Sequence, residues 1–337
     1  MWSLKRAKKA SFSIFFIAAV IVIVLIIVFF LPYHHASGKG VVITVDRGSS
    51  ASQIYDQLGS QRLVSNKLLF KIAARIFGID RRIRAGKYLF VGNYSDYNVL
   101  RLLSTGKSNL LVQVTIPEGL TIRQIAAIMD REVGVDSTEF VDIAMKDSLS
   151  HALGLPSKNL EGFAFPETYE FYYGTDPREI LERMVDEFKL FFNDSLKNRL
   201  EKLHVSLLEV VTIASIVEAE AKVDSERAII ASVYYNRLRK GMPLEADPTI
   251  EYALGQHRRI YYKDLHIRSP YNTYKKIGLP PTPICNPGRK SILAALYPAE
   301  TNYLYFVATG SGGHRFSRTF AQHLRAVRAY RKEVFGR

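Results

Sequence analysis

The sequence predicts an α+β protein with a single N-terminal transmembrane helix, a small strand-helix-helix-strand module and a larger mixed α+β domain. A long apolar run near the N-terminus, a repeated strand-turn-helix pattern and a series of helical patterns followed by Pro- and Gly-rich segments support this architecture. With 337 residues, 47% of them hydrophobic, the chain has room for two or three domains with their own cores. We place a tail at 1–11, the span at 12–31, the module at 33–110, a second strand-turn-helix unit at 111–160 and the larger domain at 161–337.

Residues 12–31 form the predicted membrane span. They are 20 consecutive uncharged positions, and a helix of about 30 Å is enough to cross the hydrocarbon core of a bilayer. The run is longer than the apolar part of a cleaved signal peptide, and no small-x-small cleavage site follows it. Four basic residues precede the run, which by the positive-inside rule places the tail in the cytoplasm. We therefore expect a single-pass protein of the plasma (inner) membrane whose main part is extracytoplasmic (periplasmic).

The formal net charge of +14 and the pI of about 9.7 indicate an anionic partner, and nucleic acid is the usual first candidate for such a chain. The predicted location excludes nucleic acid and favours cell-wall polymer and anionic lipid. The positive charge is concentrated between residues 33 and 109, which hold 12 Lys or Arg against 4 Asp and no Glu.

A faint internal repeat links the module at 33–110 to the unit that follows it. The segment 43–54 aligns without gaps on the segment 114–125. Each copy predicts a short strand, a Gly turn and a helix that is capped by Ser or Thr, with Gln three residues further on. In the first copy a second helical pattern at 66–77 and a returning strand at 86–91 follow. This order resembles a LysM module, a small unit that binds N-acetylglucosamine polymers, and a plain packing module is the alternative.

Three helical patterns occupy the larger domain before its loops. The first covers 176–203 with Pro177 as its first residue. The second covers 206–222 and opens with a capping box, and the third covers 225–240. Beyond Gly241 the content of Pro, Gly, Tyr and Asn predicts extended loops and short strands, which are typical of a polysaccharide cleft.

The second of these helices holds the most informative stretch, I-A-S-I-V-E-A-E-A at 213–221, in which two acids interrupt an apolar run. On its own face of the helix Glu218 has three apolar residues, namely Val211, Ala214 and Ala221. Such a face disfavours the ionised form of a carboxyl group, so Glu218 becomes a candidate general acid. Spacing alone equally allows both acids to point to solvent or to pair with nearby basic residues.

Several unusual runs stand on both sides of this stretch. They are, in order, EGF (161–163), FPETY (165–169), YNRL (235–238), GMPL (241–244), DPT (247–249), SPYNTY (269–274), GLPPTPI (278–284), NPG (286–288), YLYFVA (303–308) and GGH (312–314). This ordered series resembles the endolytic murein transglycosylase family, the YceG-like enzymes, over about residues 160–325.

The resemblance implies that the first Glu of the A-S-I-V-E-x-E-A motif, Glu218 here, is the catalytic acid. It further implies cleavage of the MurNAc-GlcNAc bond of peptidoglycan, with the 6-hydroxyl of N-acetylmuramic acid as the nucleophile and a 1,6-anhydro-MurNAc end as the product. One carboxylic acid is then sufficient, whereas ordinary glycosidases need two. The family role that follows is to end nascent glycan strands at the membrane, beside the peptidoglycan synthases.

Further site residues are expected around Glu218. Glu220 lies about 200° around the helix from Glu218, so we assign it, with Arg237, to the support of the site. The candidate sugar-binding residues are Asn236, Asp247, Tyr271, Asn272 and Thr273. For the Asn and Thr side chains of this set, capping of turns is an equal alternative.

The sequence predicts neither a cofactor nor a metal site, because the eight His show no metal-ligand spacing. Cys285 is the single cysteine, so the chain forms no internal disulfide, and no nucleophile motif surrounds it. Two other functions stay open. One is a muramidase-type hydrolase, in which Glu245 or Asp247 would be a second acid, and the other is a non-catalytic, membrane-tethered scaffold that binds the wall.

Overall fold

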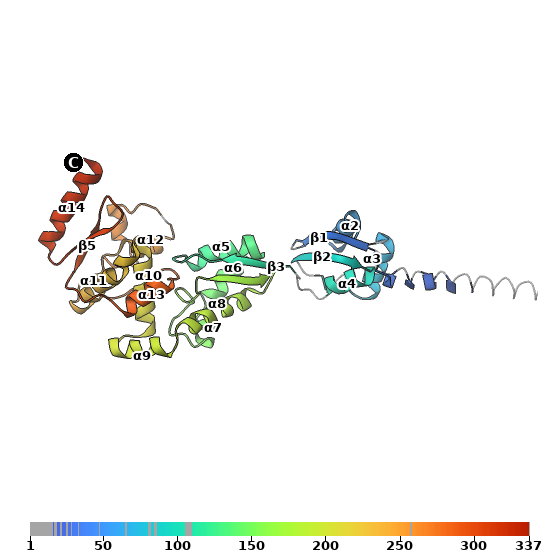
Figure 1. Ribbon diagram of the computed structural model, residues 1–337, viewed down its shortest axis with the longest axis horizontal. Helices are drawn as coiled ribbons and strands as arrows, with labels where there is room; N and C mark the ends of the chain where they lie inside the picture. The colour runs from blue at the N-terminus through green and yellow to red at the C-terminus, as the bar shows by residue number, and fades with distance from the viewer. Residues whose placement is uncertain are drawn as a thin grey trace, which may run out of the picture. The chain divides into compact units, whose positions relative to one another are not determined.

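The fold is described from a computed structural model of the chain (Figure 1). The residues it describes are 16, 19–20, 22–24, 26–27, 29–32, 34–46, 48–64, 66–79, 82–83, 86–104, 110–256 and 258–336. Helices and small two-stranded sheets make up these residues, which confirms the mixed α+β class. The chain divides into two compact units, of which unit 1 comprises 1–112 and 170–175 and unit 2 comprises 113–169 and 176–337.

The predicted membrane span at 12–31 lies partly outside the described residues. Those of its residues that are described, up to Phe30, are helical. Within the ranges given above, no helix is both long enough and apolar enough to cross a membrane.

Unit 1 has the order strand, helix, helix, strand that the sequence predicts for the module, followed by one more helix. Its elements are β1 (His34–Val45), α2 (Ala51–Ser60), α3 (Lys67–Ile76), β2 (Gly86–Tyr94) and α4 (Asp96–Ser104). The two strands pair antiparallel, with Ile43 opposite Tyr88 and a shift of register between Ala36 and Val41. Residues from both strands and all three helices form one apolar core, in which Tyr55, Phe70, Tyr88 and Phe90 are large, fully buried side chains.

The internal repeat is confirmed in its local geometry. Gly48 and Gly119 both have positive φ, 82° and 80°, which lets the chain turn from strand to helix without the strain that a Cβ atom would cause. Two residues on, Ser50 caps α2 and Thr121 caps α5 (Ile122–Val133), each through a capping box with the Gln three positions later. The same short sequence pattern therefore forms the same structure at both places.

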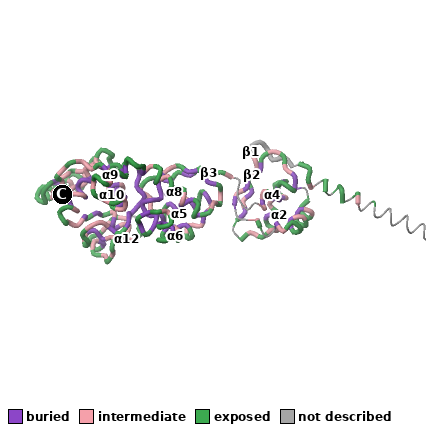
Figure 2. The backbone as a smooth tube through the Cα atoms, turned by 90° about the horizontal axis from the view of Figure 1, so that it is seen from below, coloured by how far each residue is buried: buried purple, intermediate pink, exposed green. Residues whose placement is uncertain are grey.

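The first part of unit 2 is mainly helical. Besides α5 it contains α6 (Ser137–Ala144), α7 (Asp147–Ala152), α8 (Pro177–Phe191) and α9 (Asp194–Leu203). Strands β3 (Leu111–Thr115) and β4 (Thr168–Tyr172) pair with each other, and each begins in one unit and ends in the other. In α5 and α8 the buried positions follow the helical period, as the burial colours show (Figure 2).

The prediction of one continuous helix over 176–203 is wrong. The structure has two helices, α8 and α9, separated by Phe192 and Asn193. Phe192 leaves the helical conformation with ψ of 63°, and the Asn193 side chain accepts a hydrogen bond from the backbone N of Leu196 and so caps α9. An Asn side chain can bond either to the backbone at a helix start or to other groups from within a helix, so Asn193 alone does not reveal the break.

Helix α10 (Leu207–Glu220) lies at the centre of unit 2. Eight consecutive residues, from Val210 to Val217, are buried, so the helix has no solvent face over this length. It packs on α13 (Arg289–Leu296), α11 (Arg227–Arg239), α12 (Asp247–Leu254) and α9. Two short 3-10 helices complete this part, Asp224–Glu226 before α11 and Tyr262–His266 in the long loop after α12.

The chain ends with a hairpin and a helix. Strands β5 (Tyr305–Ala308) and β6 (His314–Ser317) pair antiparallel, with Phe306 opposite Phe316. Helix α14 (Phe320–Phe335) follows and contacts both strands (Figure 1). The hairpin and α14 supply one wall of the cavity described next.

Candidate active site

The two acids of α10 reach different surroundings from the last turn of the same helix. Its capping box at Ser206 and Glu209 is the predicted one, and the helix ends at Glu220 with Ala221 as its C-cap. Because two positions correspond to about 200° of rotation, Glu218 and Glu220 leave the helix in different directions. The two acids therefore have different partners.

Glu218 lies in a polar setting rather than on the predicted apolar face. Arg227 Nη1 donates to its Oε1 at 3.0 Å, and the backbone N of Gly288 donates to its Oε2 at 2.9 Å. The Glu218 side chain is only 7% exposed, and that of Arg227 is 11% exposed, so this ion pair is well shielded from water. Val211 and Ala214 on this face are buried in the core, while the longer Glu218 side chain extends past them to these two donors.

A third carboxylate stands beside this pair. Burial and the nearby charge of Glu218 raise the pKa of Glu118. Its neighbour Gly119 leaves room, because a Cβ there would lie 3.5 Å from Glu218 Cγ, and a side chain at Gly288 would collide with the Glu118 carboxyl group. No pattern in the sequence indicates this arrangement, because Glu118 precedes Glu218 by 100 positions and shares no motif with it.

Among the described residues, Glu220 has no ion pair like that of Glu218 with Arg227, and its side-chain hydrogen-bond partner is a tyrosine. Tyr234 Oη donates to its Oε1 at 3.2 Å. Burial, together with the charge of Asp247, raises the pKa of Glu220 to about 7, and the hydrogen bond from Tyr234 opposes this shift. The raised pKa favours the protonated form of Glu220, which is the form that a general acid requires.

Glu220 also lines a cavity of ≈ 470 Å³. The walls come from the end of α10, from α11, from the segment before α12, from the β5-β6 hairpin and from α14. The lining residues are Glu220, Arg237, Leu244, Glu245, Asp247, Tyr274, Leu304, Tyr305, Phe306, Val307, Ala308, His314 and His323. The volume is within the range of sites for small molecules and sugar units, and aromatic rings stand next to carboxyl and imidazole groups on its walls.

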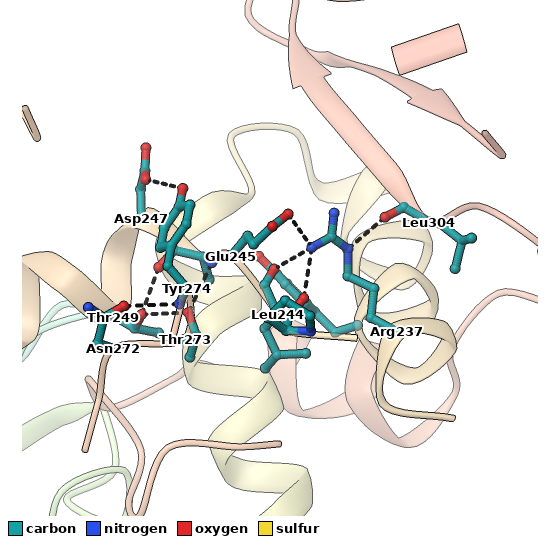
Figure 3. Close-up of polar contacts among 12 residues, drawn as sticks. Arg237, Leu244, Glu245, Asp247, Thr249, Asn272, Thr273, Tyr274 and Leu304 are labelled. Carbon is teal, nitrogen blue, oxygen red and sulfur yellow. Dashed lines mark hydrogen bonds and ion pairs between the residues drawn. The ribbon is translucent and has the colours of Figure 1, made fainter. Parts of the chain in front are cut away.

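Arg237 fixes one wall of this cavity. Its guanidinium donates to the carbonyl oxygens of Leu304, Pro243 and Leu244 at 2.7, 2.9 and 3.1 Å, and to Glu245 Oε2 at 2.8 Å (Figure 3). Leu304 lies at the start of the hairpin, and the other partners lie in the segment 243–245 that follows α11. Arg237 therefore holds the hairpin and this segment together. The supporting role in catalysis that the sequence predicts for Arg237 stays a prediction.

A second network fixes the segment that carries Asp247. Thr273 Oγ1 accepts from the backbone N of Ala246 at 3.1 Å and lies 2.9 Å from Thr249 Oγ1, and Tyr274 Oη donates to Asp247 Oδ1 at 2.6 Å (Figure 3). Thr273 is 1% exposed, so it acts on backbone positions and lies away from the cavity surface. Asp247 and Tyr274, by contrast, both line the cavity.

The remaining predicted sugar-binding residues hold loops. Asn272 is fully buried and donates to the carbonyl oxygens of Leu265 and Ile267, and Asn236 donates to those of Thr301 and Tyr303. Tyr271 Oη lies 2.7 Å from Thr282 Oγ1, and its ring packs against a neighbouring tyrosine. The turn-capping alternative describes Asn272, whose Oδ1 accepts from the backbone N of Tyr274, whereas Thr273 bonds to the distant segment 246–249. The side chains of Asn236, Tyr271 and Asn272 are not among those that line the cavity with Glu220.

Sequence reasoning gave no role in this cavity to two histidines that line it. His314 Nδ1 lies 2.7 Å from Glu226 Oε2, while its backbone N donates to Glu226 Oε1 at 2.9 Å, so the GGH run anchors the hairpin. His323 stacks on Tyr305 at 5.3 Å between ring centroids, and burial lowers its pKa. A single sequence holds no periodic signal for such contacts, since both histidines come from elements at the far end of the chain.

The EGF and NPG runs meet in a buried polar cluster. Asn286 Oδ1 accepts from the backbone N of Gly162 and of Ala164 at 2.9 and 3.0 Å, and its Nδ2 donates to Glu161 Oε1 at 3.1 Å. Burial raises the pKa of Glu161 to about 7 although the backbone N of Ile122 also donates to it. Glu161 is 2% exposed, so it stabilises the unit and has no access to a substrate.

Cys285 is buried and inert. It is 3% exposed, its thiol donates to the carbonyl oxygen of Ser215 at 3.3 Å, and burial raises its pKa far above the ordinary range. A nucleophilic cysteine needs a thiolate at an accessible position. The structure therefore supports the expectation that Cys285 has no catalytic role.

The fold and the cavity define an α+β protein in which a carboxyl group with a raised pKa lines a pocket of ≈ 470 Å³. The model of the YceG-like family matches residues 43–329. The chain belongs to the YceG-like family.

Similarity to named relatives and to a solved structure is consistent with membership of this family. The endolytic murein transglycosylase of Bacillus subtilis is 35% identical over 321 residues, which are 89% of this chain and 87% of the relative. That of Streptococcus pneumoniae is 30% identical over 84% of this chain, which spans 56% of the length of the pneumococcal protein. A crystal structure of a putative YceG-like protein from Listeria monocytogenes superposes with a TM-score of 0.59 at 33% identity, over 86% of this chain and 99% of that one.

Proposed function

We propose that this chain is an endolytic lytic transglycosylase that cleaves the MurNAc-GlcNAc bond of peptidoglycan. The position of the Glu220 carboxyl group on the wall of a cavity of ≈ 470 Å³, together with its raised pKa, carries the proposal. The family membership and the relatives named endolytic murein transglycosylase agree with it.

One carboxylic acid can perform the whole reaction in turn. It first donates its proton to the leaving glycosidic oxygen as the bond from that oxygen to C1 of N-acetylmuramic acid breaks. The 6-hydroxyl of the same sugar then forms a bond to C1, and the carboxylate takes up the proton that the hydroxyl loses. The product ends in 1,6-anhydro-MurNAc, and no water is consumed.

We assign this acid to Glu220, which changes the role that the sequence predicts for it. Glu220 lines the cavity and has a raised pKa, whereas Glu218 is engaged by Arg227 and by the backbone N of Gly288. Glu218, which the sequence favours as the acid, remains the alternative. In our assignment it positions the end of α10 through Arg227, and the two single variants described in the Discussion separate these roles.

A muramidase-type hydrolase is the second candidate, because Asp247 lies close enough to Glu220 for its charge to raise the Glu220 pKa. A hydrolase uses a second carboxylate to activate water or to attack the sugar. Asp247 accepts a hydrogen bond of 2.6 Å from Tyr274, which occupies one of its oxygens. We therefore favour transglycosylation, in which Asp247 acts on the protonation of Glu220.

The mass of the product tests the reaction type. We expect digestion of isolated peptidoglycan by the full chain to yield fragments with anhydro ends, which are lighter by one water than hydrolytic ends. In cells that lack the chain and any duplicate enzyme, the same analysis should show fewer anhydro ends and longer glycan strands. Hydrolytic ends would establish a muramidase, and the absence of any product would leave a wall-binding scaffold.

The pH dependence of cleavage follows from the raised pKa. Because the acid must be protonated in the free enzyme, we expect kcat/KM to fall as the pH rises through about 7, the pKa of Glu220. A pH-rate profile on soluble glycan fragments measures this limb. A profile that stays flat from pH 6 to pH 9 would contradict the assignment of the proton donor to Glu220.

We further propose that residues 12–31 anchor the chain in the plasma (inner) membrane with the tail in the cytoplasm and the catalytic unit outside. The uncharged run and the basic residues before it support this orientation. An enzyme tethered in this way reaches glycan strands close to the membrane. It would then act as a terminator of strand elongation beside the peptidoglycan synthases.

For unit 1 we propose a LysM-like role in wall binding, which its strand-helix-helix-strand order supports. Removal of residues 33–110 with the anchor retained should weaken binding to insoluble peptidoglycan and leave the cleaved bond unchanged, because the acid lies in unit 2. A sedimentation assay with isolated sacculi measures the binding. Equal binding with and without these residues would mean that unit 1 is a spacer.

A further inference from the structure

The outer face of α3 is an exposed apolar stripe. Three residues at i, i+4 and i+8 lie on one side of the helix, and their exposed fractions are 66%, 47% and 75% for Leu68, Ile72 and Ile76. The opposite side of α3, with Phe70 and Ala74, is in the core of unit 1. The helix therefore has two apolar faces, of which the core uses only one.

Basic side chains follow one edge of this α3 stripe. Lys67, Lys71 and Arg75 are spaced by four residues and are all exposed. A hollow next to them is lined by Lys67 and Lys71 together with the polar residues Ser52 and Asn66. Apolar side chains beside Lys and Arg form the pattern of a surface that lies on anionic lipid.

Two residues of the predicted span, Phe29 and Phe30, contact aromatic rings at the end of α3 and in α4. Phe29 stacks on Phe77, the C-cap of α3, at 6.2 Å between ring centroids. Phe29 and Phe30 also contact Tyr97 of α4, at 6.2 and 5.0 Å. Figure 1 shows α3 at the end of the unit that the N-terminal helix joins.

We propose that the α3 stripe and its basic edge dock on the anionic surface of the membrane that holds the chain. The inference rests on the proposed membrane anchor at residues 12–31. Because Phe29 belongs to that anchor and packs on Phe77, the last turn of α3 lies where the chain leaves the lipid. The excess of 12 basic over 4 acidic residues between positions 33 and 109 provides the charge complementarity.

Docking would fix the orientation of unit 1 on the membrane instead of leaving it on a free tether. The apolar stripe would enter the headgroup region, while Lys71 and Arg75 would contact lipid phosphates. Phe70 and Ala74 remain in the core, so docking requires no unfolding of α3.

The test uses the full chain, with Cys285→Ala as background, reconstituted into vesicles whose acyl chains carry a quencher. A fluorophore is placed on Ile72→Cys in the stripe or, as a control, on Ser60→Cys at the exposed end of α2. In vesicles rich in phosphatidylglycerol we expect strong quenching at position 72 and weak quenching at position 60. In phosphatidylcholine vesicles the quenching at position 72 should decrease.

A charge variant sharpens this test. Lys71→Gln with Arg75→Gln should lower the equilibrium constant for docking by about 30-fold, since each basic residue at an anionic surface contributes about 1 kcal/mol. The matched control, Lys197→Gln with Lys202→Gln on α9, removes the same charge elsewhere and should change nothing.

Three results would overturn the proposal. Equally weak quenching at positions 60 and 72, in a chain that co-floats with the vesicles, would show that the stripe does not touch lipid. Protection of position 72 that is independent of lipid charge and accompanied by cross-linking between chains would assign the stripe to a second copy. Failure of the chain to co-float would refute the anchor itself, and docking with it.

Discussion

Replacement of Glu220 by glutamine is expected to lower the rate of glycan cleavage by about 10²–10⁴-fold, the usual contribution of a general acid. The amide keeps the shape of the side chain and its contact with Tyr234, which lies 3.2 Å away, but it has no acidic proton to donate. Counting of anhydro ends released from isolated peptidoglycan measures the loss, and circular dichroism confirms that the fold is retained.

Glu218→Gln is the matched control for this variant. It removes the charge that pairs with Arg227 and leaves the cavity lining unchanged. We expect it to lower thermal stability and to reduce cleavage less than Glu220→Gln does. If the folded Glu218→Gln protein were the less active of the two, the acid would be Glu218, and the raised pKa of Glu220 would have to be read as structural.

The largest loss of stability is expected from Asn286→Leu. The substitution leaves the backbone N–H groups of Gly162 and Ala164 buried without their acceptor, and removes a donor to Glu161. Two unsatisfied buried donors cost about 4 kcal/mol in the free energy of unfolding. Urea unfolding followed by fluorescence would measure this decrease.

An exposed asparagine provides the comparison for Asn286. Asn302→Leu makes the same chemical change at a surface position and should alter the unfolding free energy by less than about 0.5 kcal/mol. Similar midpoints for the two variants would mean that the buried cluster around Asn286 does not stabilise the unit.

Local sequence patterns predicted local structure well. The capping boxes that open α2, α5 and α10 were all visible in the sequence, because the residues that form a cap lie within three positions of one another. The class of protein also followed from the motifs. The break between α8 and α9 was missed, because Asn193 is compatible with either a cap or a helix interior until the packing of its neighbours is known.

Contacts between distant segments were beyond the reach of one sequence. Gly288 donates to Glu218 from 70 positions further along the chain, and Glu118 lies near Glu218 although it precedes it by 100 positions. Only the folded chain brings these residues together. The apolar face predicted for Glu218 was correct for the helix and wrong for the carboxylate, whose length carries it past the face to Arg227. Helix periodicity gives the direction of a side chain, and its partners depend on the other elements that meet there.

Glu161 and Glu220 give the folding of unit 2 a consequence for proton balance. Both carboxyl groups have a pKa of about 7 in the folded chain against a reference value of 4.5, so between these pH values folding takes up protons from solution. Their contribution to stability is complete below about pH 4.5 and is lost as the pH rises through about 7, which is opposite in sign to that of a salt-bridged carboxylate. Unit 2 should therefore resist unfolding better in mildly acidic than in alkaline solution, and its unfolding should release protons.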